Sequence, residues 1–406
     1  MLRMSEIVEL SVEEFSSFIE KRNDKNFYQT SFMAQMQEER GFKTVYLGLK
    51  KDKEILAAGM FMLVDTIAKQ KFLRSPRGPI CDYENFEILD EFTKAIKAYC
   101  KKNKYFMVKI DPYLMLNKRD NEGEIVEGEN NLAIRDHLLS LGYKELNYSQ
   151  EEKWLYILPL TSQNKESVLK NFKQRTRNYI NQAIRLGVEV KDVEYDELDE
   201  FAEVMKETGN RQNIAVHNQK YYQLLYKCFN DKVLFKKAVL NCEKSLKILE
   251  DNKTEVATKL EKAKKESLIN DLQNQAQTLD KKINELNEVK NKYGNEVTLS
   301  VSCFIDYGDE VIYLNGGNRD ELMKYHGSFL VQKTMIDYAI DNGYSRYNFY
   351  GLGSEFPNDK ESNGVYLFKK HFSGEVYETF GEFDLAASSF YKVFNLAKKI
   401  KNKIKK

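Results

Sequence analysis

The segment between Glu243 and Tyr293 constrains the fold of this chain more than any other. It contains neither proline nor glycine, and consists mostly of Lys, Glu, Asn, Gln, Leu and Ala. Apolar residues recur in it at steps of three, four and seven, the spacing of a coiled-coil seam. They are Leu249, Val256, Leu260, Ala263, Leu268, Leu272, Leu279, Ile283, Leu286 and Tyr293. Two helices of roughly 22–28 residues, turning near residues 264–267 and each about 35–40 Å long, would bury each other's stripe.

Strand-like sequences flank this predicted antiparallel coiled-coil hairpin. Residues 233–240 precede it and residues 297–305 follow it, and both are rich in β-branched and aromatic residues. The simplest arrangement is two neighbouring strands of one sheet joined by a long excursion. The hairpin is therefore predicted as an insertion within a domain and not as a linker between domains.

An apparent internal repeat predicts two similar lobes. A helix over residues 95–103 leads into a strand at 105–110, and a helix over 334–342 leads into a strand at 345–350. A strand pair precedes each helix, at 44–49 with 55–64 and at 297–305 with 310–314. This β-β-α-β order, found twice, favours two α/β lobes with mixed sheets, as in GNAT-type acyltransferases. Because the matching residues are few, chance similarity is the alternative.

These patterns give an expected division of the chain. The first lobe covers residues 1–152, the second covers 153–242 and 294–395, and the hairpin covers 243–293. A basic tail occupies residues 396–406. It is interpreted either as a frayed solubilising end or as a segment attracted to an anionic inner membrane surface.

Composition narrows the class of protein. A chain of 406 residues exceeds one ordinary core, and 63 basic against 62 acidic residues predict no polyanion partner from net charge. Five scattered cysteines without a CxxC pair indicate reduced thiols in a cytoplasm. The four histidines lack metal-ligand spacing, so neither a metal nor a cofactor is expected. Neither a signal peptide nor a membrane-spanning run is recognisable, which favours a cytoplasmic location.

Four segments contain more Gly, Pro, aromatic and charged residues than strand ends require. They are residues 74–85 around Arg77, 109–113 around Asp111, 347–353 around Tyr350, and 364–372 around Phe368 and Lys369. Prolines on both sides of Arg77 predict a rigid turn. Asp111 is expected at the carboxyl end of a strand, where ligands bind in α/β sheets. The structural alternatives for the four segments, in the same order, are a surface turn, a capping aspartate, a glycine turn and an exposed basic pair.

A basic run at residues 170–185 is a candidate nucleic-acid surface. On a helix, Lys170, Lys173, Arg177 and Asn181 share one face, and apolar residues occupy another. Basic side chains beside an aromatic residue suit phosphates. The alternative is the solvated face of an amphipathic helix.

Together these segments resemble the Fem family of non-ribosomal peptidyltransferases, and its FemA/FemB branch in particular. The matching stretches, in family order over nearly the whole chain, are residues 27–32 with Met36, 77–83, 110–113, 172–183, 346–351 and 368–370. The hairpin lies where the family has its helical arm. The resemblance implies two GNAT-like lobes that transfer Gly, Ser or Ala from aminoacyl-tRNA to the stem or bridge amine of a peptidoglycan precursor, without a cofactor. Association with a second copy or a family relative, and peripheral contact with the inner membrane surface, are left open.

The resemblance also implies roles for individual residues. Lys369 matches a lysine that stabilises charge near the reaction centre, and Asp111 matches an aspartate proposed as a base. Substrate binding is implied for Arg211, which resembles a diphosphate contact, and for Arg77, Phe368, Tyr350 and Gln37. tRNA binding is implied for Lys173, Arg175, Arg177 and Arg185. Gln37 replaces a lysine common in relatives, which favours the lipid-linked over the nucleotide-linked precursor.

The chemistry of such a transfer can be stated from first principles. An amine attacks the ester carbonyl that joins an amino acid to tRNA, and the ester is already activated. The protein therefore has to hold two substrates together and stabilise the oxyanion and the leaving ribose oxygen. A solvated aspartate, with a pKa of about 4, is a poor base for the attacking ammonium. Lys369 is therefore the stronger catalytic candidate, and Asp111 the weaker one.

Two other functions fit parts of the sequence. One is a non-catalytic, GNAT-like binding module whose hairpin docks a partner protein. The other is an acyl-CoA N-acetyltransferase, which requires a pyrophosphate-binding turn that opens a helix. Residues 314–319 match that turn only loosely.

Overall fold

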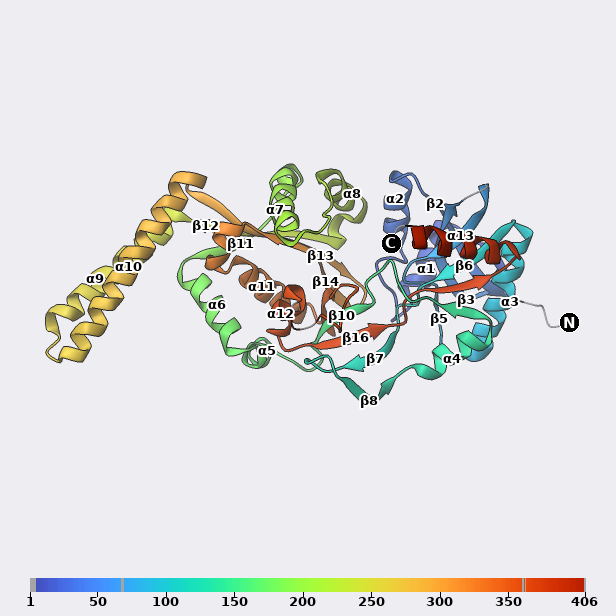
Figure 1. Cartoon of the computed structure of the whole chain (residues 1–406), viewed down its shortest axis with the longest axis horizontal. Coiled ribbons are helices and arrows are strands. Elements are labelled where there is room, and N and C mark those ends of the chain that lie inside the picture. Colours follow the sequence, from blue (N-terminus) through green and yellow to red (C-terminus); the bar gives the residue numbers. More distant parts are fainter. Residues whose placement is uncertain (1–4, 67–68, 360, 362, 405–406) are drawn as a thin grey trace.

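The computed structural model describes residues 5–66, 69–359, 361 and 363–404 as a mixed α/β protein with two sheets (Figure 1). Sheet one has the order β1 (Glu6–Glu9), β2 (Lys43–Lys51), β3 (Glu54–Asp65), β4 (Lys71–Ser75), β6 (Tyr105–Ile110), β17 (Phe383–Ala386) and β9 (Tyr143–Glu145), with β5 (Ile80–Cys81) beside β3. The helices of this lobe are α1 (Val12–Glu20), α2 (Ser31–Glu39), α3 (Phe86–Lys102), α4 (Leu132–Ser140) and α13 (Phe390–Ile404).

Sheet two is larger and carries the remaining helices. Its order is β11 (Val188–Asp192), β12 (Val233–Asn241), β13 (Glu296–Tyr307), β14 (Glu310–Asn318), β15 (Arg346–Gly351), β10 (Trp154–Pro159), β16 (Glu375–Thr379), β7 (Met115–Arg119) and β8 (Ile125–Asn130). Its helices are α5 (Lys165–Asn171), α6 (Gln174–Arg185), α7 (Leu198–Gln212), α8 (Gln219–Phe229), α11 (Gly327–Asp341) and α12 (Gly364–Lys370).

The two sheets share one topology. In sheet one, β3 and β4 are antiparallel, and α3 connects β4 to its parallel neighbour β6. In sheet two, β13 and β14 are antiparallel, and α11 connects β14 to its parallel neighbour β15. The repeat predicted from the sequence therefore exists, but its register was wrong by one strand. The short strand β4 was not recognised, so β2 and β3 were matched to β13 and β14.

The lobes exchange strands. Residues 115–130, assigned to the first lobe from the sequence, form β7 and β8 at the edge of sheet two. Strand β17, assigned to the second lobe, pairs with β6 and β9 in sheet one. Sheet membership therefore departs from the predicted boundaries at these two places. The chain enters sheet two after β6, returns to sheet one for β9, and returns to sheet one again after β16.

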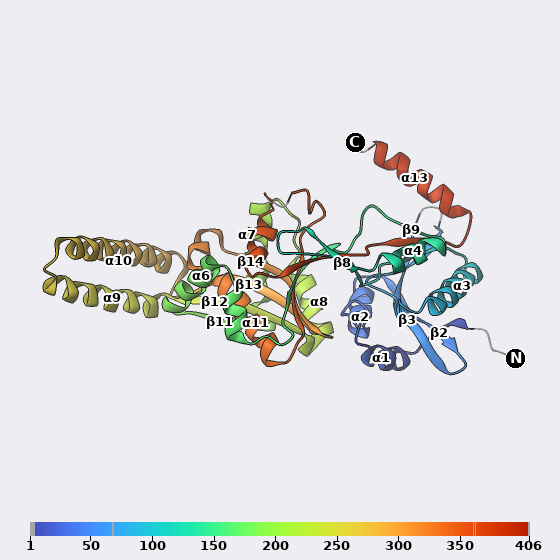
Figure 2. The ribbon, with the colours of Figure 1, turned by 90° about the horizontal axis from the view of Figure 1, so that it is seen from below.

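The hairpin consists of α9 (Cys242–Lys262) and α10 (Glu266–Tyr293), which lie side by side and project from the molecule (Figure 2). It follows β12 and precedes β13, and these strands are antiparallel neighbours. The prediction of an insertion between two strands of one sheet is thus confirmed. Leu249, Val256, Leu272 and Leu286 are buried.

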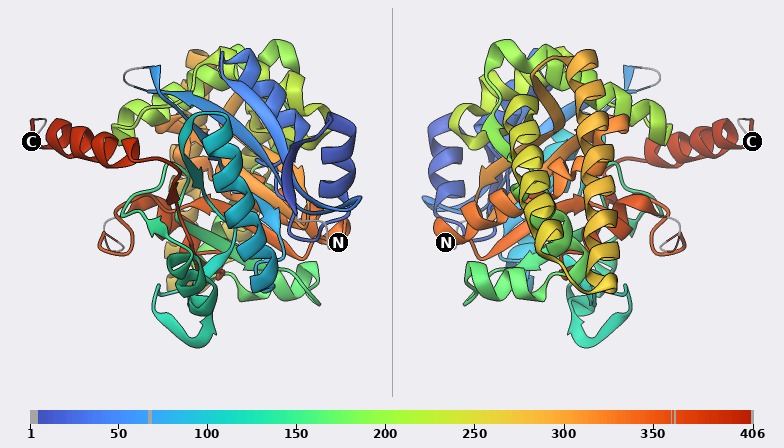
Figure 3. Two further views of the ribbon diagram at one scale, coloured as in Figure 1. Left: turned by 90° about the vertical axis from the view of Figure 1, so that its right-hand side faces the viewer. Right: turned by 90° about the vertical axis from the view of Figure 1, so that its left-hand side faces the viewer.

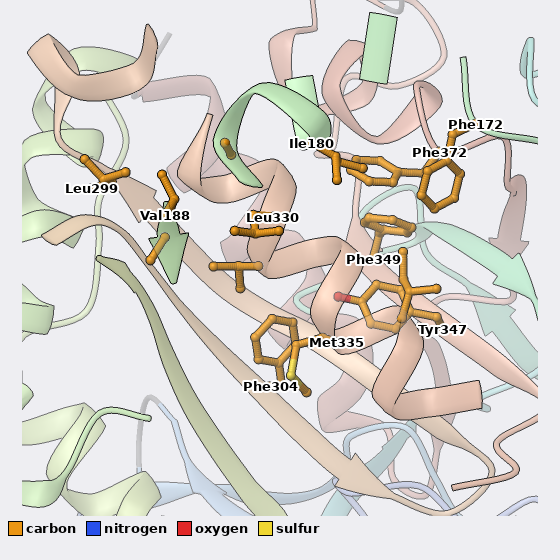
Figure 4. Packing of buried hydrophobic residues seen from close by; sticks show 14 of the residues in the cluster. Phe172, Ile180, Val188, Leu299, Phe304, Leu330, Met335, Tyr347, Phe349 and Phe372 are labelled. Atoms are coloured by element: carbon orange, nitrogen blue, oxygen red, sulfur yellow. The ribbon is translucent and has the colours of Figure 1, made fainter. Parts of the chain in front are cut away.

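Aromatic packing holds α12 against sheet two. Phe372, two residues past the end of α12, lies 4.9 Å from Phe349 of β15 and 5.1 Å from Phe172, measured between ring centroids (Figure 4). Leu330 and Met335 of α11 belong to the same core. This packing places the last turn of α12 over the end of β15.

A buried polar junction joins the two lobes. Tyr113, which follows β6, donates its hydroxyl hydrogen to Glu310 Oε1 at 2.9 Å and accepts a hydrogen bond from Asn348 Nδ2 at 3.0 Å. Glu310 Oε2 lies 3.0 Å from Arg346 Nε. The guanidinium of Arg77 stacks over the Tyr113 ring at 5.3 Å. The segment around Tyr113 and the strand β15, which are far apart in the sequence, are thereby brought into contact.

The predicted C-terminal tail is helical as far as Ile404, because it continues α13. Residues 405–406, and the side chains of 399 and 401–404, lie outside the described part. Within the described residues, no helix is both long and apolar enough to span a bilayer.

We expect Tyr113→Phe to lower the free energy of unfolding by roughly 1–3 kcal/mol, because Glu310 and Asn348 lose a buried partner. Urea denaturation measures the change. Tyr105→Phe removes a hydroxyl from a half-buried tyrosine of β6 and should change stability by less than about 0.5 kcal/mol. Equal losses in both variants would contradict a specific role for the junction.

Candidate active site

The candidate site is a cavity of about 530 Å³ that opens where β14 and β15 separate. The strands pair in parallel only at Glu310↔Arg346, Val311↔Tyr347 and Ile312↔Asn348. The residues just beyond these pairs, 313–316 on β14 and 349–351 on β15, line the cavity. A ligand is thus admitted where the sheet is interrupted, at the carboxyl ends of two parallel strands.

Three further segments contribute to the wall of the cavity, together with Met323, Ser328 and Phe329 near the start of α11. The end of α7 and the loop after it contribute residues 208, 211–212 and 214–217. The helix α12 contributes Gly364, Val365, Phe368 and Lys369, and the segment before β10 contributes residues 150–152. Four of the predicted site residues therefore meet here: Arg211, Tyr350, Phe368 and Lys369.

Lys369 occupies the last turn of α12 and is buried. Burial disfavours its charged form and lowers the pKa of its ammonium to about 7, although the nearby Glu152 carboxylate acts in the opposite direction. Its Nζ donates a hydrogen bond to the carbonyl of Gly351. Near neutral pH this side chain is therefore close to the midpoint between charged and neutral forms.

The start of α12 is fixed by Asn363. Its side chain accepts a hydrogen bond from the Tyr366 amide at 3.0 Å, which caps the helix. The same side chain donates to the carbonyl of Leu352 at 2.7 Å. Because Leu352 directly follows β15, this residue couples the orientation of α12, and hence of Lys369, to the strand end.

Glu152 packs directly against the glycine at the end of β15. A Cβ atom on Gly351 would lie 2.3 Å from Glu152 Cδ, which leaves no room for a side chain. The amide of Gly353 donates to Glu152 Oε2 at 3.2 Å. The absence of a side chain at Gly351 thus permits a close approach to the backbone, and the approaching group is a carboxylate.

Tyr350 connects the cavity to the first lobe. Its hydroxyl lies 3.0 Å from the hydroxyl of Tyr28. Its backbone is left-handed, with φ of 65°, and its amide donates to Asn348 Oδ1 at 2.7 Å. This conformation is unusual for a bulky residue, and it directs the chain away from β14 at the point where the cavity begins.

A second cavity of about 510 Å³ adjoins the first on the side of the first lobe. The two share six lining residues: Tyr28, Gln150, Glu151, His217, Tyr221 and Leu314. The second cavity is lined mainly by apolar and aromatic side chains, with Gln37, Arg40 and Arg74 among the polar ones. Gln37 is buried and accepts a hydrogen bond from Arg40 Nη1 at 3.2 Å. Two adjoining cavities can hold two substrates.

Asp111 and Arg77 lie elsewhere. Both are 1% exposed and form an ion pair with 3.6 Å between Arg77 Nη1 and Asp111 Oδ1. Burial raises the pKa of Asp111 to about 6, and the Arg77 guanidinium opposes the shift. Neither Asp111 nor Arg77 is among the described residues that line the two cavities. The structure thus does not bring Asp111 together with Lys369.

Arg211 and Phe368 reach the cavity from different helices, α7 and α12. The Arg211 guanidinium donates to the Asp320 carboxylate and lies 2.9 Å from Met323 Sδ. Phe368 packs edge-on against Phe329 at 5.0 Å between ring centroids. Arg211 is therefore already paired, and it has to exchange Asp320 for an anionic ligand in order to bind one.

The predicted tRNA-binding residues lie on and just before α6, outside both cavities. Arg177 donates to the carbonyl oxygens of Lys170, at 2.9 Å, and Phe172, and so caps α5. Arg175 stacks over the ring of Tyr179 at 5.3 Å. Arg185 lines a groove of about 370 Å³ between α6 and the hairpin. The four residues are thus spread over one helix, and Arg177 has a structural role of its own.

Lys173 connects α6 to the cavity region. Its amide donates to the carbonyl of His371 at 3.0 Å, directly after α12. Among the described residues, no group of His, Cys, Asp and Glu is arranged to hold a metal ion.

Several of these residues have no recognisable signal in the sequence. Glu152 and Gln150 lie in a polar run at residues 149–153 that is typical of a surface loop. Tyr28 belongs to a stretch that matched the family, but nothing in that stretch indicated a contact with Tyr350. Asn363 follows a serine in a polar loop, and its capping role depends on where α12 begins.

We expect Gly351→Ala to lower the free energy of unfolding by roughly 1–3 kcal/mol, because the added methyl group overlaps Glu152. The matched control is Gly364→Ala at the start of α12, where a Cβ would meet nothing within 4 Å. That variant should be neutral or slightly stabilising. Thermal unfolding of both variants provides the measurement, and a neutral Gly351→Ala would show that Glu152 is free to move aside.

Comparison with known proteins identifies the family. The model of the FemAB family matches residues 10–399. Aminoacyltransferase FemA of Staphylococcus epidermidis is 30% identical over 97% of this chain and 99% of its own length. Aminoacyltransferase FemA of Staphylococcus aureus is 28% identical over the same shares. A crystal structure of FemX covers 96% of this chain and 99% of its own at 21% identity, with a TM-score of 0.76, and shows a shared fold.

The resemblance inferred from the ordered motifs is therefore confirmed over nearly the whole length, and the enzyme class sets aside a non-catalytic binding module. The chain belongs to the FemAB family and is an aminoacyltransferase.

Proposed function

We propose that this enzyme transfers Gly, Ser or Ala from aminoacyl-tRNA to the stem or bridge amine of a peptidoglycan precursor, most readily a lipid-linked one. The observation that supports this function is the buried Lys369, with a pKa of about 7, in the wall of a cavity that adjoins a second one. Two substrates bound in adjoining cavities can meet at a single titratable group.

The transfer involves one bond formed and one broken. The amine nitrogen of the precursor attacks the ester carbonyl, the new C–N bond forms, and the C–O bond to the ribose breaks. The attacking amine loses a proton, and the ribose oxygen gains one. Positioning supplies most of the rate enhancement, and stabilisation of the oxyanion supplies the rest.

We assign the oxyanion to Lys369. In its charged form the ammonium offers donors to the developing negative charge, while the Gly351 carbonyl holds one of them in place. A charge in a buried site acts through a low effective dielectric, so it stabilises an oxyanion more than a solvated lysine does. The neutral fraction at pH 7 also gives the side chain access to the proton that the amine releases.

For Asp111 we propose a positioning role in place of the base function. Its carboxyl is enclosed beside Arg77, whose guanidinium stacks on Tyr113 and donates to Thr379 Oγ1 at 3.3 Å. Arg77 thereby supports the junction beneath the cavity. Its predicted contact with substrate would then be indirect.

We place the precursor in the second cavity and the aminoacyl end of tRNA in the first. The second cavity combines apolar side chains with Arg40 and Arg74, which suits a peptide and a phosphate-bearing group. Gln37 contributes no charge there, which supports the lipid-linked acceptor. Phe368 and Tyr350 would contact the aminoacyl group. Arg211 lines the first cavity, so it would contact the diphosphate of a precursor that extends from the second cavity into the first.

The remaining assignments concern the arm and the surface. We propose that α9 and α10 pack as a coiled coil, that the lobes are GNAT-like, and that the chain divides as predicted except for the exchanged strands. The helix α6 and the groove beside Arg185 would contact the tRNA body. The reaction would take place in the cytoplasm at the inner face of the membrane.

The test of this function is a transfer assay. The enzyme is incubated with glycyl-, seryl- or alanyl-tRNA and a lipid-linked precursor, and the product is identified by mass. Addition of one residue to the stem or bridge is expected with one of the donors. The absence of product with all three donors would contradict the proposal, provided that the protein is folded.

We expect Lys369→Met to reduce kcat by about 10²–10³, the cost of losing one oxyanion donor. The KM values should change little, because the interaction is made in the transition state. A raised KM at unchanged kcat would instead assign Lys369 to substrate binding.

The same variant should be more stable than the wild type. The folded pKa of about 7 lies below the ordinary lysine value of 10.5, so the folded state disfavours the charged form. Below pH 7 the wild-type protein carries this cost in full, and its stability rises as pH increases from about 7 toward 10.5. Lys369→Met should therefore raise Tm most at pH 6 and least at pH 9, as calorimetry can measure. An equal shift at both pH values would contradict the lowered pKa.

We expect charge reversal at Lys173 and Arg175 together to raise the KM for tRNA at least about tenfold and to make its salt dependence shallower by one to two charges. The control reverses the exposed Lys94 and Lys101 of α3, which alters net charge equally in the other lobe. Identical kinetics in both double variants would contradict tRNA binding by α6 and would indicate that its basic residues form only a solvated surface.

A further inference from the structure

The C-terminal helix α13 packs on the first lobe with one face only. Tyr391 is buried, and the rings of Phe390 and Phe394 lie 5.2 and 5.1 Å from the ring of Phe106. Beyond this contact the helix extends away from the lobe (Figures 2 and 3). Its 15 residues give it a length of about 22 Å, and among its described side chains Lys392, Val393, Leu396 and Ile400 are exposed.

The uncovered face of α13 carries an apolar stripe. Val393, Leu396 and Ile400 are 55%, 60% and 51% exposed. Their spacing of three and four residues places them on one side of the helix. Single exposed apolar residues are ordinary on a protein surface, but a stripe of three on a projecting helix marks an interaction surface.

The charge of this segment is one-signed. Residues 392–406 contain seven lysines and no aspartate or glutamate. Among the described side chains, Lys392 is exposed and Lys398 Nζ lies 4.3 Å from the centre of the Tyr148 ring. A second copy of so basic a helix would be repelled, whereas an anionic surface would be attracted.

We propose that α13 is an interfacial helix that docks this enzyme on an anionic lipid bilayer. An apolar stripe combined with a lysine-rich sequence is the chemistry of helices that lie in the plane of a membrane surface. The stripe enters the boundary between headgroups and acyl chains, and the lysines contact the acidic headgroups. Neither the burial of the stripe nor the contact of the lysines with headgroups requires the helix to span the bilayer.

The docked helix lies next to the second cavity. Phe72 lines that cavity and also contacts Phe394 of α13, with 6.4 Å between their ring centroids. Tyr148, beneath Lys398, precedes by two residues the segment 150–151 that lines the same cavity. Resting on the proposed function, the inference is that α13 brings the acceptor cavity to the surface from which a lipid-linked precursor projects its headgroup.

The experiment is co-sedimentation of the full-length protein with phosphatidylcholine vesicles, with and without phosphatidylglycerol. Binding is expected only with phosphatidylglycerol, and high salt should weaken it. Val393→Gln, Leu396→Gln and Ile400→Gln together should lower the partition coefficient at least about tenfold, since glutamine preserves helix propensity but not the stripe. The matched control is Ile125→Gln, Leu139→Gln and Leu268→Gln, at exposed apolar positions elsewhere, and it should bind like the wild type.

Three results would overturn the inference. They are an absence of binding to phosphatidylglycerol vesicles, equal binding by the stripe variant and the wild type, and a concentration-dependent dimer that the stripe variant abolishes while vesicles are not bound. The assay needs neither donor nor acceptor, so it is independent of the proposed function. Stripe-dependent binding without aminoacyl transfer would overturn the function alone, and transfer to a water-soluble acceptor without vesicle binding would overturn the inference alone.

Discussion

The short parallel pairing of β14 with β15 is the constraint on which the site depends. The strands are paired at only three positions and then separate, so their following residues face a cavity and not each other. The paired ends are held by the Glu310 carboxylate, which receives hydrogen bonds from Tyr113 and Asn348. Beyond the separation, α12 is fixed to the end of β15 by Asn363, and its last turn delivers Lys369. The positions of the cavity, of α12 and of Lys369 therefore all depend on the separation of β14 from β15.

The two lobes act as one unit at this point. Glu152 and Tyr28 approach the end of β15 from outside sheet two, and the Tyr28–Tyr350 contact lies where the two cavities adjoin. Arg77 and Asp111 form a buried ion pair nearby. Removing either partner would leave an uncompensated buried charge and lower the stability of the fold. Both residues belong to the first lobe, and the pair reaches the second lobe through the hydrogen bond from Arg77 to Thr379 of β16. This explains why a motif chosen as a catalytic candidate proves to lie in the junction.

Local patterns predicted local structure well. The uninterrupted stripe of apolar residues predicted the hairpin, and the flanking β-branched runs predicted its insertion between β12 and β13. The family resemblance selected Lys369, Phe368, Tyr350 and Arg211, and the structure places all four in the wall of one cavity. Burial and long-range pairing were not predictable in the same way. The exchange of β7, β8 and β17 depends on which distant edge each strand meets, and the enclosure of Asp111 depends on Arg77 and Tyr113 packing around it.

The central claim is that Lys369 is held in a site that disfavours its charge, at the meeting point of two substrates. Its ionisation can be measured directly by NMR titration of protein labelled with ¹³C at the lysine side chains, the resonance being assigned by its loss in Lys369→Arg. The structure predicts a midpoint at a pKa of about 7, well below those of the exposed lysines. A midpoint close to the ordinary lysine value of 10.5 would contradict the account, because the lysine would then be an ordinary solvated cation.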